Sequence, residues 1–124
     1  MMPILHKLSL YLLAVLFVGA GVLHFVAPAT YLRIMPPYLP APLLLVYVSG
    51  AAEIAGGLGL LVPATRRVAC LGLIILLLAV FPANVYMLQT HGAGLAVPLW
   101  ALWLRLPLQL LLMAWVWWSA RTQA

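Results

Sequence analysis

Charged residues are scarce in this sequence, and acidic ones are the scarcest. They make up 6% of the 124 residues, with one Asp or Glu against six Lys and Arg. Soluble domains carry about 25% charged residues, so this composition excludes an ordinary soluble domain. The basic residues are scattered rather than gathered on one stripe, so the formal charge of +5 predicts no nucleic-acid partner.

Cysteine is almost absent as well. Because Cys70 stands alone, the chain has no internal disulfide and no thiol pair for dithiol exchange. The histidines, His6, His24 and His91, lack the spacing of metal ligands, so we expect no bound metal. No cofactor motif is visible either, and we expect no cofactor.

Apolar residues dominate instead, at 68% of the chain. A helix needs ~20 apolar residues to cross a bilayer. Four runs of about that length cover residues 8–26, 43–62, 68–88 and 99–119. The later connections are short, which favours antiparallel neighbours. The sequence therefore predicts an all-α polytopic membrane protein, in which residues 1–124 form a single domain built as an antiparallel four-helix transmembrane bundle.

Prolines mark the first connection and two of the spans. Residues 27–42 hold five prolines, which predicts a stiff cap with extended or turn backbone. Pro82 and Pro107 lie inside the third and fourth runs, where each removes a backbone hydrogen bond. Kinks at these two positions would widen the outer half of the bundle, and the alternative is that the membrane helices simply tolerate proline.

Basic residues in the short flanking segments predict the orientation. One side of the membrane carries Lys7, Arg66, Arg67 and Arg121, and the other carries Arg33 alone. Because positively charged flanks stay in the cytoplasm, both termini are expected there, with Arg33 and His91 outside. The predicted location is the inner (plasma) membrane of a bacterium.

Five polar side chains fall inside the predicted spans: His24, Glu53, Asn84, Arg105 and Gln109. An ionisable residue at the bilayer centre costs roughly 2.5 to 3.5 kcal/mol, so Glu53 needs an internal partner. Arg105 is the only basic residue well inside a span, and it is the predicted partner. Gln109 lies one turn beyond Arg105 on the same helix face.

At ~1.5 Å per residue, all five lie between the outer interface and the midplane, while the inner half has almost no polar groups. This distribution favours a ligand site and argues against a channel or proton relay, which needs polar groups across the whole bilayer. A structural network of interhelical hydrogen bonds is the alternative. The small residues of 49–57 would let another helix approach the second span closely.

Several stretches resemble the DoxX-like family of small four-helix membrane proteins. They are Gly21–Phe25, Met35–Pro40, Tyr47–Gly57, Phe81–Tyr86 and Arg105–Gln109. The family includes a subunit of an archaeal thiosulfate:quinone oxidoreductase, a component of a bacterial membrane redox complex, and eukaryotic chaperones for receptor assembly. The resemblance implies a four-helix membrane fold but not one activity.

The expected function is that of a non-catalytic accessory subunit, at most part of a membrane oxidoreductase. Its outward-facing polar pocket, lined by the five polar residues, would bind a small amphipathic molecule such as a quinone or a lipid headgroup. The alternative is an assembly factor or chaperone whose partner is another membrane protein.

Overall fold

The computed structural model describes residues 3–33, 35–90 and 98–120, all of whose regular secondary structure is helical. The helices are α1 (Ile4–Val26), α2 (Pro28–Arg33), α3 (Pro42–Leu61), α4 (Arg66–Gln89) and α5 (Leu99–Ala120). This confirms the predicted all-α fold with four long helices. His91 and Arg121, two residues used to predict the orientation, lie outside the described residues.

All four long helices are long and apolar enough to cross a membrane. Large apolar side chains cover their outward faces, among them Val15, Val68 and Trp100, each about 70% exposed. A soluble protein does not leave so much contiguous apolar surface in water, whereas lipid tails cover such a surface readily. The chain is therefore a small multi-span membrane protein.

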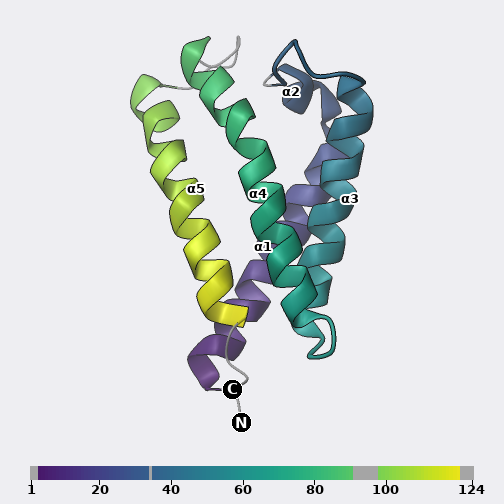
Figure 1. Ribbon diagram of the computed structural model, residues 1–124, viewed down its shortest axis with the longest axis vertical. Coiled ribbons are helices and arrows are strands. Elements are labelled where there is room, and N and C mark those ends of the chain that lie inside the picture. The colour runs from purple at the N-terminus through teal and green to yellow at the C-terminus, as the bar shows by residue number, and fades with distance from the viewer. Residues whose placement is uncertain (1–2, 34, 91–97, 121–124) are drawn as a thin grey trace.

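The long helices pack as two pairs, and the contact between α3 and α4 joins the pairs (Figure 1). α1 packs along α3, α4 packs along α5, and α3 contacts α4. The start of α1 and the end of α5 lie at the same end of the bundle as the turn between α3 and α4, and we call this the terminal end. The opposite end carries α2 and is called the α2 end. α1 and α5 come together at the terminal end and diverge toward the α2 end.

The hydrophobic core lies in the terminal half of the bundle. Its buried members are Leu10, Leu13, Phe17, Leu60, Cys70, Leu73, Leu77 and Val116. At the terminal end the ring of His6 stacks on that of Trp118, with 3.8 Å between their centroids. The buried apolar cluster therefore lies toward the end where the start of α1 and the end of α5 meet.

The first connection differs from its prediction. Residues 35–41 contain the predicted turns, but the connection also contains the short helix α2, which begins at Pro28. Proline suits the first position of a helix because its fixed φ is helical and its missing N–H would have no partner there. Proline also stands at the start of α3, at Pro42. Prolines in this connection thus begin helices as well as restricting the backbone.

The turn between α3 and α4 is closed by side chains. The Nε of Arg66 donates to the carbonyl of Leu60 over 2.7 Å, and the hydroxyl of Thr65 donates to that of Gly59 over 2.9 Å. Carbonyls at the end of a helix lack backbone donors, and a cation there also interacts favourably with the helix dipole. α4 therefore begins at Arg66, two residues before the predicted span.

Candidate functional site

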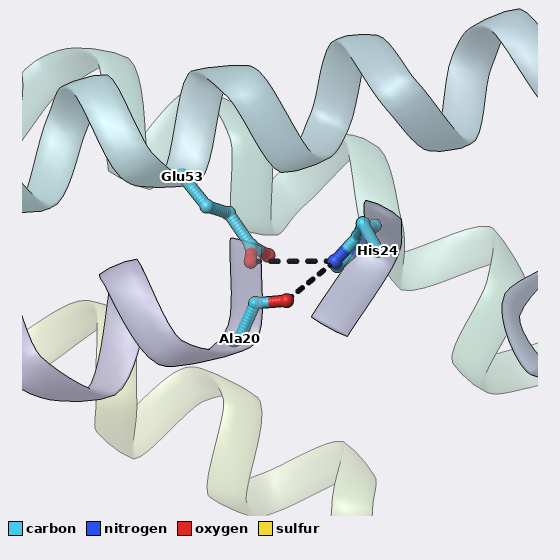
Figure 2. A network of polar contacts seen from close by, with 3 residues as sticks. All are labelled: Ala20, His24 and Glu53. Carbon is cyan, nitrogen blue, oxygen red and sulfur yellow. Dashed lines mark hydrogen bonds and ion pairs between the residues drawn. The ribbon is translucent and has the colours of Figure 1, made fainter. Parts of the chain in front are cut away.

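His24 of α1 and Glu53 of α3 face each other in the α2-end half of the bundle (Figure 2). The Nδ1 of His24 lies 2.7 Å from the carbonyl oxygen of Ala20 and 3.7 Å from Oε2 of Glu53. A carbonyl oxygen only accepts, so Nδ1 carries a hydrogen that it donates to Ala20. The carboxylate oxygen is thus near the imidazole but has no hydrogen bond from it. We call these residues the His24–Glu53 pair.

Oε2 of Glu53 is buried, and no hydrogen-bond donor reaches it within the described part of the chain. Buried polar atoms almost always have a partner, because an unpaired one costs the free energy of its lost hydration. Nδ1 of His6 and Oγ of Ser119 are likewise buried without a partner in the described residues, but of the three side chains only Glu53 is acidic.

Two glycines bring α1 and α3 together beside this pair. A Cβ added to Gly21 would lie 2.5 Å from the carbonyl oxygen of Gly50, and one added to Gly50 would lie 2.7 Å from Cβ of His24. Only glycine fits at such a backbone approach. The predicted role of the small residues around Glu53 is confirmed at Gly50.

Tyr31 of α2 covers the imidazole. Its ring stacks on that of His24, with 3.8 Å between the centroids. Burial raises the pKa of the Tyr31 phenol; the negative charge of Glu53 raises it further, and the positive charge of Arg105 lowers it. The phenol is therefore neutral at physiological pH and lies within electrostatic reach of both charged side chains.

A second polar group joins α4 to α5. The side-chain amide of Asn84 donates to Oε1 of Gln109, and its Oδ1 accepts from Nε and Nη2 of Arg105 at 3.3 and 3.0 Å. Asn84 and Gln109 are buried, whereas Arg105 is exposed. We call these three residues the Asn84 group. The predicted shared face of Arg105 and Gln109 is consistent with their common contact with Asn84.

Gln109 of the Asn84 group also bonds to the backbone of α4 near Pro82. α4 continues through Pro82, as α5 does through Pro107. A proline leaves the carbonyl four residues before it, here at Leu78, without its backbone donor. At the neighbouring carbonyl of Leu77, Nε2 of Gln109 donates a hydrogen bond from α5. This hydrogen bond links α5 to α4 one residue away from the carbonyl that Pro82 leaves without its helical donor.

The structure thus brings the five predicted residues together as two groups, rather than around one ion pair. The predicted Glu53–Arg105 pair is wrong: Oε2 of Glu53 lies 3.7 Å from Nδ1 of His24, and Arg105 contacts Asn84 instead. Glu53 and Arg105 have similar depths along their helices. However, α3 packs on α1 and α5 packs on α4, so the two side chains have different partners. Sequence reasoning missed Tyr31, because Ala27 and Pro28 interrupt the helical periodicity that would relate it to His24.

Double-mutant cycles should separate the two groups. Arg105→Ala and Asn84→Ala are expected to be coupled by about 1 kcal/mol, because each substitution removes the same hydrogen bonds. Glu53→Ala and Arg105→Ala should be additive, because the two side chains have different partners. Thermal unfolding in detergent measures both couplings. Strong Glu53–Arg105 coupling with an uncoupled Asn84 would contradict this division.

Comparison with known proteins gives a family but no activity. A family described as Domain of unknown function (DUF8561) matches residues 13–120, from within α1 to the last residue of α5. No curated protein and no solved structure matches the chain. The match gives no DoxX assignment, so it does not support the resemblance drawn from the sequence. Since the match extends over all four long helices, the chain belongs to the family with the domain of unknown function DUF8561.

Proposed function

We propose that this protein binds a small amphipathic molecule at the α2 end, as a non-catalytic accessory subunit of a membrane assembly. The unpartnered Oε2 of Glu53 is the main observation in its favour. A ligand that donates a hydrogen bond to this oxygen would satisfy it. The accessory-subunit role also draws on the resemblance to DoxX-like proteins.

Arg105 supplies the complementary interaction. Its Nε and Nη2 share one neutral acceptor, Oδ1 of Asn84, so the guanidinium keeps further donors for a ligand. A molecule with one donor and one acceptor in its polar end and an apolar remainder in the lipid fits both groups. Quinols and lipid headgroups have this character.

The orientation is part of the proposal. Lys7, Arg66 and Arg67 lie toward the terminal end and Arg33 at the α2 end, so the basic-residue bias places the α2 end outside. Alkaline phosphatase fused to the C-terminus should be inactive, and the same enzyme inserted after Tyr38 should be active. An active C-terminal fusion would reverse the orientation and turn the proposed site toward the cytoplasm.

A second candidate is an assembly factor for another membrane protein. Ala51 and Ala55 are exposed on α3, four residues apart, and small residues at this spacing let a partner helix approach closely. Replacing both by leucine would disrupt such an interface while leaving the two polar groups intact. Loss of a partner protein on purification would favour this function.

Ligand retention tests the proposed function. The parent protein, His24→Ala and Asn84→Ala should be purified in mild detergent, and the co-purified small molecules identified by mass spectrometry. Both variants are expected to lose a molecule that the parent retains, whereas Gln89→Ala, an exposed change near the same end of α4, should keep it. Destabilised variants with an unchanged small-molecule profile would show that the polar groups are structural.

A further inference from the structure

The charges of the chain do not balance inside the bundle. Glu53 is its only acidic side chain, and the structure places it against His24. The guanidinium of Arg105 lies within a span and contacts a neutral amide. Ionisable groups at membrane depth usually pair with an opposite charge. This sequence holds no second acidic side chain, so a countercharge for Arg105 would come from another molecule.

Glu53 has the opposite need. The hydrogen on Nδ1 of His24 is directed to Ala20, and Oε2 of Glu53 has no donor within the described ranges. A hydrogen-bonding cation satisfies such an oxygen better than a neutral donor, because charge-assisted hydrogen bonds are stronger. Among the described residues, Glu53 therefore lacks a hydrogen-bonding cation, and Arg105 lacks an anion.

Tyr31 lies beside the His24–Glu53 pair. Its ring contacts His24 of the first group, and its phenol lies within the fields of both Glu53 and Arg105. As a neutral phenol it can accept from a cation and donate to an anion. A molecule lying against Tyr31 would lie beside the His24–Glu53 pair, and the exposed side chain of Arg105 would reach its other end.

We propose that the ligand headgroup is zwitterionic, with a primary ammonium bound by Glu53 and a phosphate bound by Arg105. This inference rests on the proposed function and names its ligand class. Headgroups of the phosphatidylethanolamine type have this chemistry, and free phosphoethanolamine shares it without the acyl chains. The complex adds no net charge to the bundle.

Other headgroups meet only part of the requirement. An anionic phosphatidylglycerol has a phosphate for Arg105 but no cation for Glu53. A phosphatidylcholine has a positive charge, but its quaternary ammonium has no N–H to donate. A quinol has donors but no anion. The selectivity between these headgroups is thus the property to measure.

The test titrates purified protein in detergent with short-chain phosphatidylethanolamine, phosphatidylglycerol and phosphatidylcholine, and records binding by native mass spectrometry. The parent should favour phosphatidylethanolamine over each of the others by about tenfold, which corresponds to ~1.4 kcal/mol. Glu53→Gln should remove this preference, and Glu53→Asp, which keeps the carboxylate, should retain part of it. Arg105→Gln should weaken all three lipids about equally.

Arg33→Gln is the matched control, since it removes one positive charge from the exposed end of α2 without touching either group. It should leave the selectivity unchanged, and melting temperatures identify any variant that fails to fold. Free phosphoethanolamine distinguishes the ligand sources: binding as tight as that of the lipid supports a soluble zwitterion, and much weaker binding supports a phospholipid.

Equal or tighter binding of phosphatidylglycerol by the parent would overturn the zwitterionic headgroup, as would a preference that survives Glu53→Gln. The proposed function would then stand if another co-purified molecule still depended on His24 and Asn84. If neither the lipids nor any co-purified molecule depended on these residues, both proposals would fail.

Discussion

Gly21→Ala is expected to destabilise the folded bundle by about 3 kcal/mol, the upper part of the usual range for overpacking a close interface. The added Cβ would lie 2.5 Å from the carbonyl oxygen of Gly50 and 2.6 Å from a side-chain carbon of Ile54. The first of these atoms belongs to the backbone, which cannot rotate away as a flexible side chain would. α1 and α3 must therefore separate, and this separation also displaces the His24–Glu53 pair.

Gly19 and Gly72 provide matched controls on α1 and α4. A Cβ at either position meets no atom within 4 Å. Because alanine favours the helix over glycine by about 1 kcal/mol in aqueous systems, both controls should be neutral or slightly stabilising. Thermal or denaturant unfolding in detergent measures the differences. A Gly21→Ala protein as stable as Gly19→Ala would show that the close approach of α1 and α3 is wrong.

Arg66→Ala should cost about 2 kcal/mol, within the range for hydrogen bonds to a charged group. Arg66 is buried, and its guanidinium donates to the carbonyls of Leu60 and Leu61 at 2.7 and 3.4 Å. Removal of the side chain leaves these carbonyls at the end of α3 without that donor. The effect is read from unfolding in detergent.

Arg67→Ala is the control for this change, since the neighbouring arginine is exposed and the same charge is lost. Its stability should remain within about 0.5 kcal/mol of the parent, as is usual for surface substitutions. An equal loss of stability in the two variants would mean that only the positive charge at this end of the bundle contributes to stability. The hydrogen bonds of Arg66 would then contribute nothing measurable.

The fold was predictable from the sequence because lipid imposes a simple requirement. A backbone in hydrocarbon must satisfy its own hydrogen bonds, so long apolar runs such as 68–88 form helices. The ends were less predictable, since they depend on side-chain contacts that periodicity does not encode. α4 begins at Arg66 because this side chain folds back on α3. α1 begins at Ile4, where the adjacent turn packs His6 on Trp118.

The sequence predicted which residues form the candidate site, but it did not predict which of them contact one another. Burying an ionisable side chain in the membrane costs free energy, and this alone identifies Glu53 and Arg105 without knowledge of how their helices pack. Which side chains meet depends on helix pairing, and four antiparallel helices of similar length allow more than one arrangement. The glycine approach that fixes Gly21 against Gly50 also fixes Glu53 against His24. The depth of a residue along its helix does not indicate which neighbouring helix its side chain faces.

The location of the core toward the terminal end has a consequence for local opening. Amide hydrogen exchange is slowest where many apolar contacts must break together and fastest where few do. Amides near Leu13 and Leu73, both almost fully buried, should exchange only when the whole bundle opens. Those of α2, which has no buried residue, should exchange through smaller fluctuations. The fold therefore combines a cooperatively folded terminal half with an α2 end that opens more easily. The two polar groups lie nearer the α2 end, where the proposed ligand would enter without unfolding the core.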